Sequence, residues 1–155
     1  MSRCPQNSSS IGRLRTVILA VFLGLALPAL AADASRLLIV VQGIESATGE
    51  IGCALYAGAE GFPLDDSKAV LIWQPAQKDR VECAFEDLPE GAYAVAVSHD
   101  LNQNRQTDKN FFGIPKEAWG VSNNVRPRLR APRFDEASFD LSKNQDLRIE
   151  IEVSR

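Results

Sequence analysis

Oxygen-bearing side chains recur at alternate positions in one polar stretch of the chain, in an arrangement that suits calcium. They occupy positions 1, 3, 5 and 9 of a D-x-N-x-N-x-x-x-D array, and they are Asp100, Asn102, Asn104 and Asp108. Calcium takes about six to eight hard oxygen ligands, which alternating Asp and Asn side chains on a curled loop can aim at one point. The backbone carbonyl of Gln106 would supply a further ligand at position 7.

The same array has a second interpretation that needs no metal. Asn and Asp side chains accept hydrogen bonds from backbone N–H groups two residues on, and both tolerate left-handed backbone. Arg105 stands at position 6, where an EF-hand loop has Gly, and Phe111 stands at position 12 in place of the bidentate Glu. Glu117 can replace that Glu only if the loop folds back. A calcium site and a self-satisfied structural loop therefore both remain open.

His99 is the only histidine in the chain, and it directly precedes the array. As the general base of a hydrolase it would work with Asp100 or Glu117. Its neighbours Ser98 and Asp100 point to the opposite side of an extended strand, which argues against a preassembled triad. Ser122 lacks a nucleophile-elbow sequence around it. The alternative role for His99 is a hydrogen bond that fixes the base of the loop.

Aromatic, amide and charged groups follow the array in a combination that suits a sugar or a peptide. An aromatic ring stacks on the ligand while amides bind its hydroxyl or peptide groups. We expect the ligand contacts among His99, Lys116, Glu117, Trp119, Ser122, Asn123 and Asn124. In the alternative interpretation the large apolar side chains fold inward as a satellite core beneath the loop. These are Phe111, Phe112, Ile114 and Trp119.

Arginines recur a little further along the chain, where they alternate with apolar residues or proline. They are Arg126, Arg128, Arg130 and Arg133. In an extended backbone the first three project from one side, where they can meet phosphate or sulfate groups of envelope lipids or glycans. The alternative is a solvated edge that blocks sheet-to-sheet aggregation and pairs with the many acidic residues.

The segments around residues 99–124 read as β-strands, whereas that stretch itself is too polar and too broken by Gly and Pro for a buried element. Alternating apolar residues predict strands at 36–42, 50–56, 69–74, 80–86, 92–99, 137–141 and 147–154. No segment is convincingly an amphipathic helix. The sequence therefore predicts an all-β protein, a single antiparallel β-sandwich of about seven strands, transthyretin-like or Ig-like, with one long functional loop.

The strand at 92–99 has two different faces. Tyr93, Val95, Val97 and His99 lie on one face, and the other face carries only small residues, which allow another layer to approach closely. Gly91-x-Tyr93 at its start is similar to a tyrosine corner, in which the hydroxyl bonds to backbone across the turn.

Two cysteines remain beyond the N-terminal region, and both fall at inward positions of predicted strands. A disulfide between Cys53 and Cys83 would close a loop of about 30 residues and stabilise the fold by roughly 3–4 kcal/mol. The alternative is a pair of buried free thiols, which behave as small apolar groups.

Residues 1–31 have the features of a Sec-type signal peptide. Arg3, Arg13 and Arg15 precede an apolar run at 17–27, and Ala29-Leu30-Ala31 offers a cleavage site. The run is shorter than the roughly 20 residues of a spanning helix. We expect a periplasmic or secreted domain at 32–155 with no transmembrane segment. Cleavage removes three of the 17 basic residues and none of the 20 acidic ones, so the formal charge becomes −6, which disfavours nucleic acid as a partner.

Taken together, these motifs resemble a bacterial secreted family, domain-of-unknown-function family 2141, over nearly all of the mature chain. The most specific matches are His99-Asp100-x-Asn102-x-Asn104, Gly113-Ile114-Pro115-Lys116-Glu117 and Gly120-x-Ser122-Asn123-Asn124, with Phe85-x-x-Leu88-Pro89-x-Gly91-x-Tyr93 before them. The chain departs from the family at Arg105, where a Gly usually follows the second Asn. The resemblance implies a transthyretin-type or carboxypeptidase-regulatory-type sandwich and carries no established activity.

Three functions fit these observations. The first is an exported non-catalytic binding or accessory module of the cell envelope, which presents the loop at 99–124 to a glycan, peptide or protein, with or without calcium. The second is a hydrolase that uses His99 with Asp100 or Glu117. The third is a structural envelope protein that pairs with a partner through its sheet edges.

Overall fold

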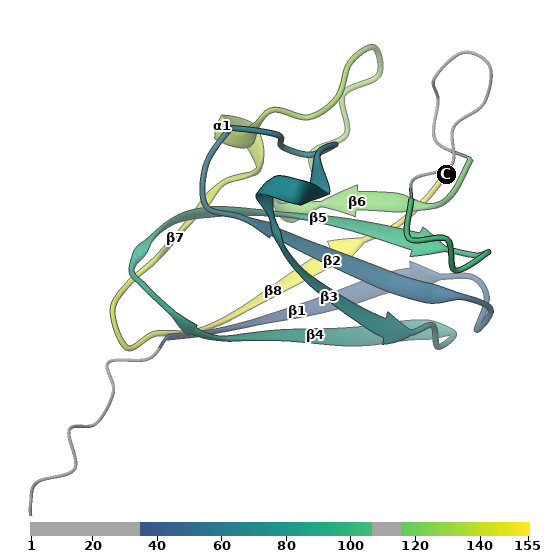
Figure 1. The fold of residues 1–155 in the computed structure, drawn as a ribbon, viewed down its shortest axis with the longest axis horizontal. Helices are drawn as coiled ribbons and strands as arrows, with labels where there is room; N and C mark the ends of the chain where they lie inside the picture. The colour runs from purple at the N-terminus through teal and green to yellow at the C-terminus, as the bar shows by residue number, and fades with distance from the viewer. Residues whose placement is uncertain (1–34, 107–115) are drawn as a thin grey trace, which may run out of the picture. The chain divides into compact units, whose positions relative to one another are not determined.

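The computed structural model describes residues 35–106 and 116–155, and these residues fold mainly as β-strands (Figure 1). The strands are β1 (Ser35–Ile44), β2 (Glu50–Tyr56), β3 (Val70–Pro75), β4 (Asp79–Leu88), β5 (Gly91–Asp100), β6 (Trp119–Val121), β7 (Phe139–Leu141) and β8 (Asp146–Glu152). The helical turns are η1 (Asp66–Lys68), η2 (Ser122–Asn124) and α1 (Phe134–Ala137). The predicted signal peptide lies outside the described residues and stays a prediction.

The strands form two sheets, which confirms the predicted all-β sandwich. One sheet has the order β4-β1-β8, and the other has the order β3-β2-β5-β6 with β7 paired to β5. The extra strand relative to the sequence prediction is β6, which lies inside the stretch predicted to be loop. It is only three residues long, too short for alternation to reveal it. The stretch predicted as a long loop therefore begins with strand residues, since His99 and Asp100 belong to β5, and its last six residues form β6 and η2.

The expectation of a wholly antiparallel sandwich needs one correction. β8 pairs with β1 in parallel, from Arg36 opposite Asp146 to Gln42 opposite Glu152, whereas the other strand pairs are antiparallel. The chain enters β8 beside the start of β1, where the Arg36 N–H donates to the Gln145 carbonyl over 3.0 Å. β8 then runs in the same direction as β1 because both strands start at this end.

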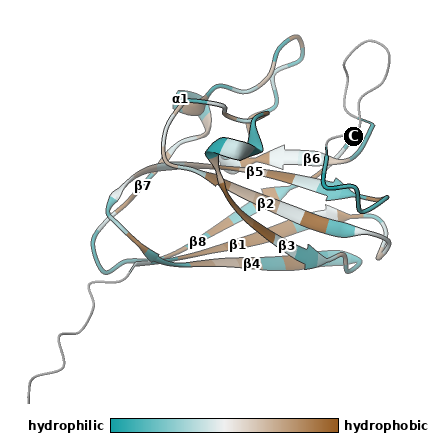
Figure 2. Ribbon diagram, in the orientation of Figure 1, coloured by the Kyte–Doolittle hydropathy of each residue, from teal (hydrophilic) through white to brown (hydrophobic). Residues whose placement is uncertain are grey.

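The core lies between the two sheets and is built from the inward faces that the sequence predicts. Leu37, Ile39 and Val41 of β1 meet Ile51, Cys53 and Leu55 of β2 and Tyr93, Val95 and Val97 of β5. In Figure 2 hydrophobic residues lie along these strands, and the turn before β3 and the stretch after β5 are hydrophilic. Within the described residues, no helix is long and apolar enough to span a membrane.

The predicted disulfide is present and joins the two sheets. Cys53 of β2 and Cys83 of β4 are both fully buried, their Cα atoms lie 6.6 Å apart, and 30 residues separate them in sequence. The bond therefore connects the sheet β3-β2-β5-β6 to the sheet β4-β1-β8 through the middle of the core.

The two faces of β5 also behave as the sequence predicts. The Tyr93 hydroxyl donates to the Pro89 carbonyl over 2.9 Å, which is the expected tyrosine-corner bond. On the opposite face Ala94 packs in a second, smaller apolar cluster with Val121 and Ala137, and Phe62 and Phe134 pack against it. Small side chains on β5 thus let a second layer cover this end of the outer face.

Candidate ligand-binding groove

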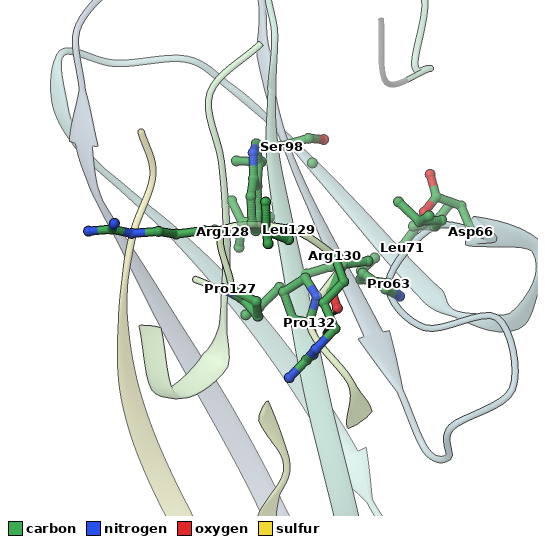
Figure 3. Close-up of a pocket in the computed structure, with 18 of the residues that line it drawn as sticks. Pro63, Asp66, Leu71, Ser98, Pro127, Arg128, Leu129, Arg130 and Pro132 are labelled. Carbon is green, nitrogen blue, oxygen red and sulfur yellow. Dashed lines mark hydrogen bonds between the residues drawn. The ribbon is translucent and has the colours of Figure 1, made fainter. Parts of the chain in front are cut away.

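The rest of that outer face carries a groove with a volume of about 450 Å³, within the usual range of small-molecule sites (Figure 3). Its floor is made of small residues, Gly52 and Ala54 of β2 with Ala96 and Ser98 of β5. They lie on the outer face because their neighbours Cys53 and Val97 point into the core. A sheet surface without bulky side chains leaves room for a ligand to lie against it.

The two tryptophans of the chain both line this groove, one from each edge of the sheet. Trp73 of β3 packs over the floor so closely that a Cβ at Gly52 would lie 2.6 Å from its ring. The guanidinium carbon of Arg105 lies 5.4 Å from the centre of the Trp73 ring, and that of Arg126 lies 4.3 Å from the centre of the Trp119 ring. Both rings are therefore held by cation–π contacts.

The segment 127–132, with sequence Pro-Arg-Leu-Arg-Ala-Pro, also lines the groove and is tied down on both sides. On one side Arg126 donates hydrogen bonds to the carbonyls of Trp119 and Ser154. On the other side Arg130 forms a two-bond ion pair with Glu136, at 2.5 Å and 2.8 Å. The hydrogen bond from Arg130 lowers the pKa of Glu136 to about 2, and the Arg133 backbone N–H contributes.

Exposed apolar side chains concentrate at the groove. Among the described residues, four large apolar side chains are exposed, and three of them, Leu64, Leu71 and Leu129, line it. Leu129 is 98% exposed. Scattered exposed leucines are ordinary, but a group of them around one concave surface indicates a binding site for an apolar ligand.

The two sides of the groove carry side chains of opposite charge. Asp66 lies on one side of it and Arg128 on the opposite side (Figure 3). Asp66 accepts a hydrogen bond from the Tyr56 hydroxyl over 3.2 Å. Burial, followed by the charge of Asp66, raises the pKa of Tyr56 well above its usual range, so this hydroxyl stays protonated and continues to donate.

The Asx array folds as consecutive turns outside the groove. The carboxylate of Asp100 accepts from the N–H groups of Asn102, at 3.2 Å, and Arg105, at 2.5 Å. The Asn102 side chain accepts from Asn104 over 3.0 Å, and the Asn104 side chain accepts from Gln106 over 2.8 Å. This pattern is the self-satisfied Asx-turn arrangement, and it places Arg105 where it reaches both Trp73 and Glu50.

The calcium interpretation stays a prediction. Asp108, one of its expected ligands, lies outside the described residues. Within residues 35–106 and 116–155, no three His, Cys, Asp or Glu side chains gather in a way that could hold a metal ion. Arg105 adopts a left-handed φ of 55°, as the position-6 residue of such a loop must, although it is not Gly.

Replacing Asp100 with Ala is expected to lower the free energy of unfolding by about 2 kcal/mol, because two N–H groups lose a charged acceptor in a site that is 1% exposed. Urea unfolding measures this change, with Asp140→Ala at an exposed position of β7 as the matched control. An equal stability of the two variants would contradict the structural role. Thermal unfolding in excess calcium tests the calcium interpretation. That interpretation predicts a rise in Tm for the wild type and none for Asp100→Ala.

His99 and Glu117 are buried at the base of the Asx turns. The Nε2 atom of His99 lies 2.8 Å from the Thr48 carbonyl, which can only accept, so Nε2 carries the hydrogen of this bond. The Glu117 carboxylate accepts from the Leu101 N–H over 3.1 Å. The His99 bond ties the end of β5 to the turn between β1 and β2, and in the neutral ring it leaves the lone pair on Nδ1. The role of His99 in fixing the base of the loop stays a prediction.

The remaining predicted contact residues tie neighbouring elements together. The buried Ser122 hydroxyl donates to Ala137 over 2.6 Å and accepts from the Val95 N–H over 2.9 Å. Asn123 donates to the carbonyls of Glu136 and Ser138, while Asn124 donates to that of Glu150 and accepts from the Glu152 N–H. Lys116 is exposed at the border of the described residues. That these four residues bind a ligand stays a prediction.

Of the ligand contacts expected between His99 and Asn124, Trp119 lines the groove, and so do Arg128 and Arg130 of the arginines expected to meet an anion. Three members of the predicted satellite core, Phe111, Phe112 and Ile114, lie outside the described residues. Sequence reasoning missed Leu64, Leu71 and Trp73 as site residues. Trp73 and Leu71 alternate with the inward Ile72 of β3, which was the signal that could have placed them on the outer face.

Comparison with known proteins gives one match. No curated protein and no solved structure shows significant similarity to the chain. A model of the family described as "Uncharacterized protein conserved in bacteria (DUF2141)" matches residues 39–150, which include every strand that builds the groove. This match extends over most of the chain and agrees with the resemblance noted from its motifs, and we conclude that the chain belongs to the DUF2141 family of uncharacterized bacterial proteins.

Proposed function

We propose that this chain is an exported, non-catalytic binding module of the cell envelope, and that its groove on the outer face of β3-β2-β5-β6 holds an apolar ligand. The observation that carries the proposal is the gathering of Leu64, Leu71 and Leu129 around a concave surface with a floor of small residues. Leaving these side chains in water costs free energy that a ligand recovers when it covers them, at about 25 cal/mol per Å².

Two further observations support the proposal. A disulfide such as Cys53–Cys83 persists in oxidising compartments and is rare in the cytosol, so it supports export. Two candidates for a hydrolase make structural bonds, since Nε2 of His99 is bonded to Thr48 and the Ser122 hydroxyl is buried between Val95 and Ala137. Binding therefore fits these residues better than catalysis.

The position of the groove permits a direct binding assay. The chain has two tryptophans, and both line the groove. The neutral apolar dye N-phenyl-1-naphthylamine absorbs where tryptophan emits, so a dye bound in the groove quenches the emission of both residues and becomes fluorescent itself. We expect saturable quenching by this dye in the folded protein, and no saturable signal would contradict the proposal.

Leu129→Gln is expected to weaken binding of the dye about fivefold, since partly covering a leucine contributes about 1 kcal/mol. The substitution should leave stability within about 0.5 kcal/mol, because the Leu129 side chain is almost wholly exposed. Val70→Gln is the matched control, since Val70 is 59% exposed but does not line the groove. Equal affinities in the two variants would place the dye elsewhere on the protein.

A further inference from the structure

We infer that the ligand of this groove is an amphiphile with an anionic head group, and that the segment 126–130 receives the head group while the floor receives the apolar chain. This inference rests on the proposed function and adds the chemical class of the ligand. It starts from the charges at the groove, which the apolar lining does not explain.

The positive charge at the groove contrasts with the rest of the chain. The protein has a formal charge of −3, yet Arg126, Arg128 and Arg130 follow one another at alternate positions of a single segment. Arg126 is engaged with Trp119, and Arg130 is paired with Glu136. Arg128 makes no hydrogen bond or ion pair with any residue of the described ranges, and in Figure 3 its guanidinium extends away from Leu71 and Asp66, so an anionic head group would meet it at the outer margin of the groove.

The distribution of charge gives the ligand a direction. Asp66 stands across the groove from Arg128 (Figure 3). An anionic group is repelled from the Asp66 side and attracted to the arginine side, while an apolar chain extends over Ala54 and Ala96 towards Leu71. A guanidinium binds either a carboxylate or a phosphate through paired N–H donors, so the head group is defined by its charge.

The polar groups that line the groove are too few for a sugar or a peptide. Side chains with polar atoms there are Asp66, Ser98, Arg128 and Arg130 together with the two indoles. Asp66 and Arg130 are already engaged with Tyr56 and Glu136. A guanidinium also occupies a face of the Trp119 ring. The groove therefore offers too few polar groups and ring faces to bind several hydroxyl groups or a peptide backbone.

Displacement of N-phenyl-1-naphthylamine tests the inference with four competitors below their micellar concentrations. They are dodecanoate, dodecanol, dodecyltrimethylammonium and acetate. We expect dodecanoate to displace the dye at about fivefold to tenfold lower concentration than dodecanol, the cationic amphiphile to be weakest of the three, and acetate to displace nothing. Added salt should reduce the advantage of dodecanoate over dodecanol.

Arg128→Gln is expected to abolish most of the preference for dodecanoate over dodecanol, measured as the ratio of the concentrations at which the two displace the dye. Arg36→Gln is the matched control, since Arg36 is an exposed arginine of β1 in the other sheet and its loss changes the net charge equally. Equal displacement by dodecanoate and dodecanol overturns the inference and leaves the proposed function standing. Displacement by acetate also overturns it, because the groove would then take a small anion. Absence of dye binding overturns the proposed function itself.

Discussion

Replacing both half-cystines with alanine is expected to lower the free energy of unfolding by about 3–4 kcal/mol. The bond closes a loop of 30 residues, and in the chain-entropy model a loop of this length restricts the unfolded chain by about that amount. The expected fall in Tm is about 15 °C for a domain of this size. Thermal and urea unfolding of the wild type and of Cys53→Ala/Cys83→Ala measure the effect.

A reductant provides the internal control for this prediction. Dithiothreitol should bring the wild type close to the stability of the double variant, and it should not change the double variant. A double variant as stable as the oxidised wild type would contradict the prediction. Cys53 lies in β2 between Gly52 and Ala54 of the groove floor, but its side chain points into the core, so the substitution leaves the floor unchanged while the protein is folded. Dye binding by the double variant should therefore persist at low temperature and disappear when the variant unfolds.

Much of this fold could be predicted because alternation with a period of two is a local signal. Cys53 and Cys83 each sit among apolar residues two positions away, which placed both sulfurs on inward faces and made the disulfide expected. The Gly91-x-Tyr93 start of β5 predicted a bond from the Tyr93 hydroxyl to backbone across the turn, and Pro89 is its acceptor. This signal is local too, because the turn and the tyrosine are close in sequence.

The features that sequence reasoning missed depend on long-range neighbours. The parallel pairing of β8 with β1 joins residues more than a hundred positions apart, such as Leu37 and Leu147, and neither strand alone indicates its direction relative to the other. The strand β6 forms because Trp119 and Gly120 find open partners on Ser98 and Val97 of β5. No pattern within three residues can predict such pairing.

The groove was missed for a related reason. Its lining comes from six separate stretches between Gly52 and Pro132, and no two of its walls are neighbours in sequence. The sequence predicts that another layer can approach the small residues on the outer face of β5, and one interpretation of the arginines at 126, 128 and 130 is an anion site. Only the sheet order brings the small residues, both tryptophans and the arginine segment to one surface.

Gly49→Ala is expected to lower the free energy of unfolding by about 3 kcal/mol, the second large effect that the structure predicts. Gly49 has a φ of +84°, where a Cβ costs about 1–2 kcal/mol. That Cβ would also lie 2.0 Å from the Asp100 carbonyl oxygen and 2.8 Å from the Leu101 Cα atom, so backbone must move to make room. Overpacking of this kind adds about 1–3 kcal/mol.

The backbone that must move is the start of the Asx turns, so the substitution should affect the groove as well as stability. Displacing Asp100 shifts the carboxylate that accepts from the Arg105 N–H, and Arg105 contacts the Trp73 ring. A change in tryptophan emission of the folded variant should therefore accompany the loss of stability. Gly58→Ala is the matched control, since a Cβ there meets nothing within 4 Å and should change stability by less than about 0.5 kcal/mol. Equal stability of Gly49→Ala and Gly58→Ala would contradict the prediction, because it would show that the backbone around Asp100 makes room for a Cβ at Gly49 without cost.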